Sequence, residues 1–256
     1  MKKLNFAMLA IVSTTVIYGC GSDNPEPDPF VVITQQDFSE LWGDITRHSV
    51  SPFPGTPGPA GRNVSWDFSA YSSVVSTIPQ EGFECPGNEG CSGFPEANRM
   101  FKHSVGGYTY YVLSDNDLIT LGGTGGDGGM ETYTDPQTMW EFPLEYGKTW
   151  SDSFSSIHAN MAGDPFMATE GEGIWEVDGY GTLITPAGTF PNTLRIKETT
   201  TRVFTGFVNM VSTIEIYHWM NKDYEGGVLA MFMVSTSNLP GDAGSTSFAF
   251  MDANPL

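Results

Sequence analysis

Glycine and proline occur so often along this chain that few uninterrupted helices fit between them. The 256 residues include 30 glycines and 17 prolines, many of them clustered between short apolar or alternating runs. Both residues disfavour the interior of a helix and are common in turns. Aromatic residues make up 13% of the chain, which suits strands that share a sizeable core. The sequence therefore predicts an all-β class, an antiparallel sandwich or open half-barrel with at most one short N-terminal helix.

Apolar and polar residues alternate most clearly in the C-terminal half. In residues 172–183, one face carries Trp175, Val177 and Leu183, and the other carries Glu172, Glu176, Asp178 and Tyr180. This pattern is typical of a half-buried strand with an acidic outer face. Residues 228–234, VLAMFMV, are apolar on both faces. We expect them to form a central strand that is covered on both sides.

The one short helix is expected after residue 33. Phe38, Leu41 and Trp42 follow the i, i+3, i+4 spacing of a helical face. Thr34 stands three residues before Asp37, which is a weak capping pattern. We expect the helix to end at the glycine that follows Trp42.

The N-terminus has the features of a bacterial export signal. Two lysines precede an uncharged run that ends at Gly19, and at about 1.5 Å per residue this run is too short for a spanning helix. The segment Ile17-Tyr18-Gly19-Cys20 resembles the lipobox of bacterial lipoproteins, which implies an acylated Cys20. The alternative is a free or buried cysteine near an ordinary cleavage site. We therefore expect a lipoprotein signal peptide (1–19), an acidic, proline-rich tether (20–30) and a single β-rich domain (31–256).

The anchor and the charge limit the partners. Several acyl chains give a stable membrane anchor, and residue 21 is Gly rather than the Asp that favours inner-membrane retention. We expect an outer-membrane lipoprotein on the periplasmic side or the cell surface. Without residues 1–19 the chain keeps 11 − 2 = 9 basic and 30 acidic residues, a net charge near −21. Nucleic acid is an unsuitable partner for such a surface.

Two further cysteines lie close together in the sequence. Cys85 and Cys91 flank Pro-Gly-Asn-Glu-Gly, which contains turn-forming residues. In an exported protein such a pair predicts a local disulfide. A metal site is the alternative, but no other Cys or His follows until His103.

Three segments of the sequence are similar to motifs of other bacterial proteins. They are GPAGRNVSWDFSAY (58–71), FPLEYGKTWSDSFSS (142–156) and GYGTLITPAGTFPNTLRIK (179–197). They resemble motifs of uncharacterised secreted and lipid-anchored envelope lipoproteins of Bacteroidota, over roughly residues 34–235. The resemblance implies an envelope location and a β-fold, and it supplies no catalytic residue.

The titratable residues offer few patterns for catalysis. Glu176-Val177-Asp178 resembles part of the Glu-x-Asp-x-x-Glu motif of jelly-roll β-glucanases, but position 181 is Gly. A glycosidase needs two carboxylates about 5–5.5 Å apart across a cleft. No two of the histidines, His48, His103, His158 and His218, have the spacing of metal ligands. His218 shares the parity of Ile214 and Ile216, so we expect it to point inward as a structural histidine.

Two oxygen-rich loops are candidate ligands for calcium. Ser114–Asp117 and Gly126–Gly128 supply Asp and Asn side chains, but without EF-hand spacing. Turns held by their own Asx side chains are the simpler interpretation. We predict no metal or other cofactor.

Methionines in the last strands suggest either core packing or an apolar cavity. Met210, Met220, Met231 and Met233 fall there together with Trp219 and Phe232. Methionine fills irregular apolar space and lines adaptable binding surfaces. We therefore expect a binding or structural module, with a lipid or glycan as the candidate ligand, and identify no catalytic residue. The alternative is a carboxylate-dependent hydrolase acting on an envelope or extracellular polysaccharide.

Overall fold

The computed structural model describes residues 31–40, 42–85, 91–103, 106–224 and 227–252. These residues form fifteen strands and one helix, α1 (Gln35–Glu40). The predicted all-β, mainly antiparallel class with one short N-terminal helix is confirmed. The predicted signal peptide, Cys20 and the tether lie outside the described residues. Within these ranges, no helix has the length and hydropathy of a membrane span.

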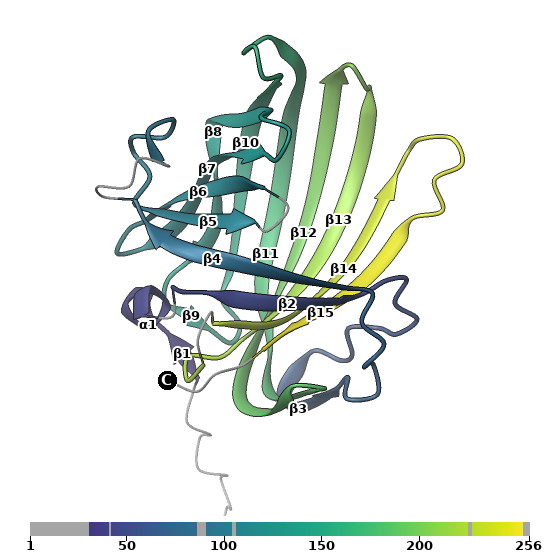
Figure 1. Cartoon of the computed structure of the whole chain (residues 1–256). Coiled ribbons are helices and arrows are strands. Elements are labelled where there is room, and N and C mark those ends of the chain that lie inside the picture. Colours follow the sequence, from purple (N-terminus) through teal and green to yellow (C-terminus); the bar gives the residue numbers. More distant parts are fainter. Residues whose placement is uncertain (1–30, 41, 86–90, 104–105, 225–226, 253–256) are drawn as a thin grey trace, which may run out of the picture.

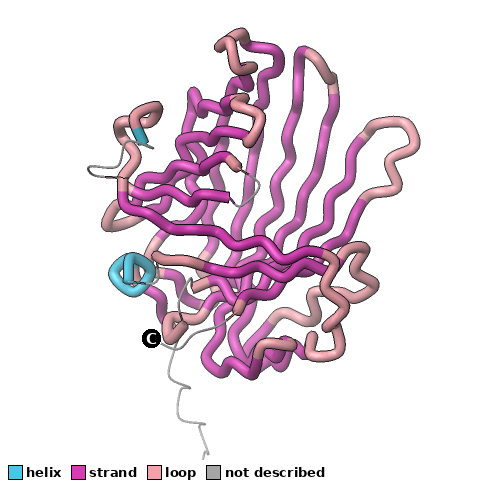
Figure 2. Tube along the Cα trace, in the orientation of Figure 1, coloured by secondary structure: helices cyan, strands magenta, loops and turns pink. Residues whose placement is uncertain are grey.

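Twelve strands form a closed, barrel-like sheet, which we call the ring (Figures 1 and 2). In ring order they are β10 (Thr149–Ala159), β8 (Met130–Glu141), β7 (Asp117–Gly125), β6 (Gly107–Leu113), β5 (Arg99–His103), β4 (Ser76–Glu84), β2 (Ile45–Val50), β15 (Ser245–Met251), β14 (Val228–Ser237), β13 (Met210–Met220), β12 (Gly188–Gly206) and β11 (Pro165–Thr185). Antiparallel pairing of β10 with β11 closes the ring.

Three strands lie beside the ring. β3 (Gly61–Asp67) pairs with β11 in parallel. β1 (Val32–Ile33) and β9 (Leu144–Glu145) form a separate two-stranded sheet near α1 (Figure 1). We call the end of the ring near α1 the base. The opposite end is formed by the tips of the long hairpins, and we call it the mouth.

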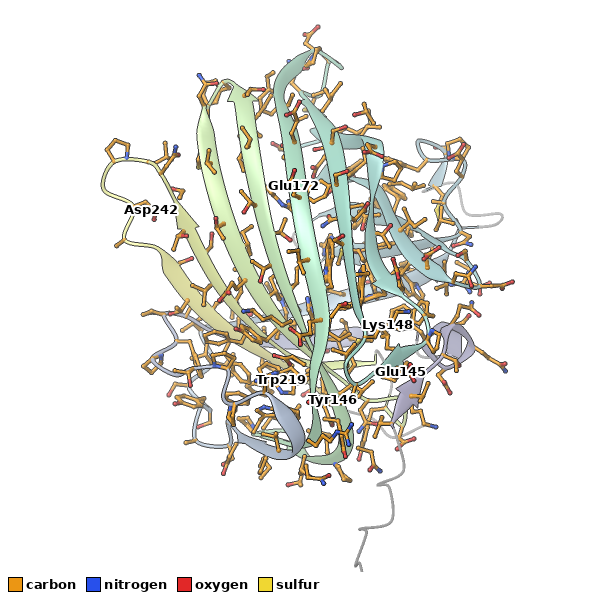
Figure 3. The ribbon with its side chains drawn as sticks, turned by 180° about the vertical axis from the view of Figure 1, so that it is seen from behind. Glu145, Tyr146, Lys148, Glu172, Trp219 and Asp242 are labelled. Carbon is orange, nitrogen blue, oxygen red and sulfur yellow. A yellow bond between two sulfur atoms is a disulfide. The ribbon has the colours of Figure 1, made fainter. Side chains whose placement is uncertain are left out.

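Side chains alternate between the interior and the exterior of the ring, because successive residues of a strand point to opposite faces. On β10, Trp150 and Phe154 are buried, whereas Ser151 and Ser153 are exposed. On β11, Trp175 and Val177 are buried, whereas the glutamates Glu172 and Glu176 are exposed, as the sequence predicts. Figure 3 shows one of these, Glu172, on the long strands seen from behind.

The alternation predicted for β11 is wrong beyond Val177. A β-bulge between Val177 and Gly179 shifts the register against β12. Tyr180, expected on the outer face, packs in the base core, whereas Asp178 stays on the outer side but is buried against Arg195, and each is only 8% exposed. Leu183 packs in a different core cluster from Trp175. After the bulge, Tyr180 therefore packs inside and Leu183 outside, the reverse of the predicted alternation.

The core consists of three clusters. The base core fills the base of the ring and contains Ile33, Leu144, Trp150, Trp175 and Ile196. The outer core lies outside the ring, beneath the segment 50–71, and contains Phe53, Trp66, Phe68, Trp219 and Phe248. The third cluster surrounds Cys85 and Cys91, with Phe94, Met100 and Tyr110. Apolar side chains therefore stabilise both faces of the sheet.

Two local predictions are confirmed. Cys85 and Cys91 form a disulfide. Thr34 and Asp37 cap α1 reciprocally, since the Asp37 carboxylate accepts from the Thr34 N–H at 2.8 Å and the Asp37 N–H donates to the Thr34 hydroxyl at 3.1 Å. Both features depend on residues close in sequence, so the sequence pattern was sufficient to find them.

Candidate functional site

An inner chamber of about 200 Å³ lies inside the ring, next to the base core. Apolar side chains from α1 and several strands form most of its wall: Phe38, Trp42, Ile45, Phe101, Tyr111, Leu118, Met139, Trp140, Val228, Met231 and Met251. Four polar residues complete it: Arg47, Gln80, His103 and His218. Trp42 stacks on Phe101 with ring centroids 4.3 Å apart. Such a wall suits an apolar guest with a few directed polar contacts.

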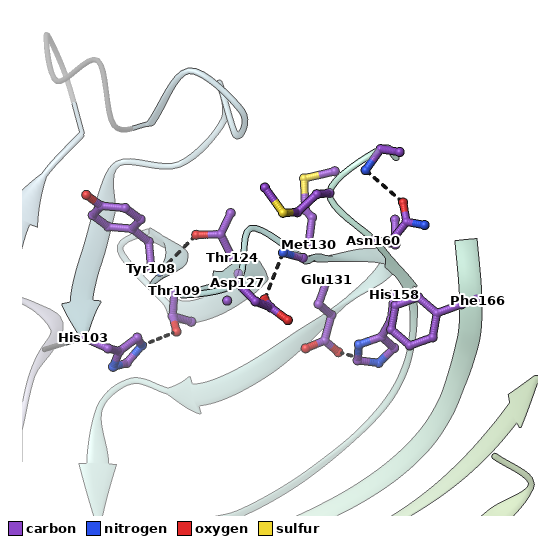
Figure 4. A pocket seen from close by; sticks show the side chains of 16 residues that line it. His103, Tyr108, Thr109, Thr124, Asp127, Met130, Glu131, His158, Asn160 and Phe166 are labelled. Atoms are coloured by element: carbon purple, nitrogen blue, oxygen red, sulfur yellow. Dashed lines mark hydrogen bonds and ion pairs between the residues drawn. The ribbon is translucent and has the colours of Figure 1, made fainter. Parts of the chain in front are cut away.

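A wider cavity of about 790 Å³ occupies the mouth (Figure 4). Thr109, Glu131 and His158 line it from β6, β8 and β10. Glu131 approaches His158 to 3.5 Å and accepts a hydrogen bond from Ser156 at 2.7 Å. His103 lines both the mouth and the inner chamber. The two spaces are therefore neighbours along the interior of the ring.

His103 is held in one orientation between two strands. Its Nδ1 is 2.8 Å from Gln80 Nε2 on β4, and its Nε2 is 2.9 Å from the Thr109 hydroxyl on β6. If the Gln80 amide donates to Nδ1, Nε2 carries the proton and donates to Thr109. Burial, and then the charge of Arg47, lower the pKa of His103 below its usual value. His103 is therefore neutral at pH 7.

His218 and Glu198 form a buried pair on adjacent strands. His218 Nε2 lies 3.4 Å from Glu198 Oε2, and the Thr200 hydroxyl donates to Glu198 Oε1 at 2.8 Å. Burial acts to raise the pKa of Glu198, but the His218 hydrogen bond and charge, together with the Thr200 bond, lower it overall. His218 Nδ1 is buried and has no hydrogen-bond partner among the described residues. The prediction of an inward, structural His218 is consistent with this geometry, and the residue also contributes to the chamber wall.

His103→Gln is expected to make the folded protein less sensitive to acid. An unfolded histidine gains a proton near pH 6.5, whereas folded His103 gains it only at lower pH. The unfolded state therefore binds more protons below about pH 6.5, and the free energy of unfolding falls with pH in that window. Glutamine does not titrate and keeps an amide for Thr109. Denaturant unfolding between pH 7.5 and 5 checks this, and an unchanged slope in the variant would contradict it.

The other predicted candidates do not form a common site. Glu176 is exposed outside the ring, whereas Asp178 is buried and bound to Arg195, so the two carboxylates do not form a glycosidase pair. Asp115 and Asp127 lie in turns at opposite ends of β7. Asp127 accepts a bond from the Gly129 N–H at 3.0 Å, as an Asx turn would. No metal-binding group of three or more His, Cys, Asp or Glu side chains occurs in the described part of the chain.

The methionine pattern identified part of the chamber. Met231 lines it, whereas Met220 belongs to the base core. Met139 and Met251 also line the chamber and were missed. The alternation in β2 places Arg47 on one face with Ile45, but it does not tell which face is inside. Only closure of the ring shows that the face with Ile45 and Arg47 is the inner one.

Comparisons of the chain with protein-family models, with curated proteins and with solved structures found no match.

Proposed function

We propose that this protein is a cell-envelope lipoprotein, anchored at Cys20, whose β-domain binds an amphipathic small molecule inside the ring. The inner chamber is the observation that carries the proposal. Strands and α1 form its wall, and eleven of its fifteen wall residues are apolar. Pockets for drug-sized ligands span about 300–1,000 Å³ and are mostly apolar with a few polar groups. The chamber alone is smaller, so the ligand would extend from it towards the mouth.

A lipid-like ligand fits this interior better than a glycan. A sugar presents several hydroxyl groups that need partners when buried. Of the polar residues of the chamber, Gln80 and His103 are already bonded to one another. The mouth also carries exposed apolar side chains, with Met161 79% and Phe166 46% exposed. Such side chains favour the entry of an acyl chain.

The proposal treats the ring as a barrel with an internal site, rather than as a sandwich. The unbroken series of strand pairings, closed by β10 and β11, supports this interpretation. A fully packed sandwich core would leave no internal site. An outer-membrane anchor would keep such a carrier close to a source of acyl chains.

Decan-1-ol is expected to bind the wild-type protein with a stoichiometry of one. Trp42 and Trp140 lie on the chamber wall, so their fluorescence should report binding. Val228→Phe places a larger side chain at the wall and should weaken binding at least tenfold. The matched control is Val211→Phe, which adds the same ring at an exposed position of β13 and should bind as the wild type does.

Absence of saturable decan-1-ol binding to the folded wild-type protein would overturn the proposal. Equal weakening by both valine variants would overturn the assignment to the chamber. Far-UV circular dichroism of each variant confirms that it is folded before titration.

A further inference from the structure

Arg47 places a positive charge on the wall of a mostly apolar chamber. It lies in β2, opposite Met251 of β15 and Ile78 of β4. Ile45 and Arg47 line the chamber, while His48 stacks on Phe250 with centroids 5.1 Å apart. Because residues of a strand alternate in direction, this fixes Arg47 as an inward residue.

The Arg47 guanidinium has no hydrogen bond and no ion pair with any residue that the structure describes. Its Nε is buried and unsatisfied. None of the wall residues of the chamber is an Asp or Glu. Burial lowers the pKa of Arg47, and no neighbouring carboxylate opposes that effect. Arginine nevertheless keeps its proton in proteins, so a charge remains on the wall.

The interior carboxylates are already engaged elsewhere. Glu198 is bound to His218 and Thr200, and Glu131 is bound to Ser156 and lies beside His158. The charge of Arg47 is not among the causes that lower the pKa of Glu198, although it does lower the pKa of His103. Arg47 therefore has no described carboxylate of this chain within reach to compensate its charge.

The Nε atoms of Arg99 and Arg202 are also buried without a hydrogen bond, but each of the other arginines that the structure describes has a charged or aromatic neighbour. Arg99 contacts Glu84 at 3.2 Å, and Arg195 binds Asp178 at 2.8 Å. Arg202 lies 5.2 Å above the Phe154 ring and its charge acts on Glu198. Arg62 lies 5.1 Å above the Tyr146 ring. A partly buried charge without a partner is unfavourable, and removing it from water costs several kcal/mol.

We infer that the ligand of the chamber is a single-chain amphiphile with an anionic head, a carboxylate or a phosphate monoester, which binds Arg47. This inference rests on the proposed function and adds the charge and orientation of the ligand. The planar guanidinium donates two parallel hydrogen bonds to such an anion. Neutral His103 and Gln80 provide a polar side of the wall next to it. The alkyl chain packs among Trp42, Phe101 and Met231.

Isothermal titration of the full-length protein with three probes tests the inference: decanoate, decyl phosphate and decan-1-ol, each below its micellar concentration. We expect at least one of the two anions to bind at least tenfold more tightly than the alcohol. Arg47→Met keeps an apolar side chain of similar length and should abolish that preference without weakening decan-1-ol. Comparison of the two anions distinguishes a carboxylate from a phosphate head.

Arg202→Met is the matched control, because Arg202 is also an inward arginine of the ring but does not line the chamber. It should keep the preference for anions. Equal affinity of all three probes for the wild type overturns the inference and leaves the proposed function standing. An anion preference that survives in Arg47→Met also overturns it. Binding of none of the probes overturns both proposals. The wild-type comparison needs no variant, so a folding defect in Arg47→Met does not prevent the test.

Discussion

Asp178→Ala is expected to lower the free energy of unfolding by about 3–5 kcal/mol, the range for removing one partner of a buried ion pair. Asp178 accepts two hydrogen bonds from Arg195, from Nε and Nη2, each 2.8 Å long. The Arg195 side chain is 2% exposed. Without the carboxylate its charge would be buried and uncompensated. Equilibrium unfolding in urea measures the loss.

Glu176→Ala provides the control, since Glu176 is two residues away on the same strand but is exposed. Its effect should stay within about 0.5 kcal/mol. The double variant Asp178→Ala/Arg195→Met should be more stable than Asp178→Ala, because it removes the unpaired charge as well. If Asp178→Ala and Glu176→Ala unfold at the same urea concentration, the ion pair does not stabilise the fold.

Arg195 also attaches the segment 50–71 to the ring. Its Nη1 donates to the carbonyls of Pro57 and Gly58, at 2.7 and 3.0 Å. Its guanidinium carbon lies 5.3 Å from the Trp66 ring and 5.2 Å from the Tyr217 ring. Cation–π contacts of this kind strengthen when they are desolvated. One side chain therefore joins β12, the bulge of β11 and the loop before β3.

Local sequence signals predicted the features that depend on neighbouring residues. The cap of α1, the Cys85–Cys91 disulfide and the inward side of Trp175 all follow from spacings of a few residues. The role of Asp178 does not, because it requires a bulge that no alternation signals and a partner on the next strand. Sequence alternation read through position 178 therefore assigns the wrong face to Tyr180 and Leu183.

The chamber was predictable only as a class of site. Clustered methionines and aromatics suggested an apolar cavity in a curved sheet, and Met231 does line one. The residues that give it polarity come from strands far apart in sequence: Arg47 from β2, Gln80 from β4, His103 from β5 and His218 from β13. They meet only because the ring closes between β10 and β11. Non-local pairing of this kind cannot be read from periodicity.

Gly181→Ala is expected to destabilise the protein by about 3 kcal/mol, at the upper end of the range for overpacking. β3 pairs with β11 at this point, with Gly181 opposite Val64. A Cβ on residue 181 would overlap the Val64 carbonyl oxygen and lie 2.6 Å from the Val64 nitrogen. Both atoms belong to the backbone, so β3 would have to move, together with the buried Trp66. Urea unfolding measures the change.

Gly43→Ala is the matched control, because a Cβ there meets no atom within 4 Å. It should be neutral or slightly stabilising, since alanine restricts the unfolded chain more than glycine does. Because the contact of β3 with β11 packs against the outer core, we expect folded Gly181→Ala to bind decan-1-ol with wild-type affinity. A lower free energy of unfolding with unchanged affinity for decan-1-ol would mean that the outer layer stabilises the ring and that only the interior binds the ligand. A loss of affinity in the folded variant would instead mean that displacement of β3 deforms the chamber, and the two layers would have to be treated as one unit.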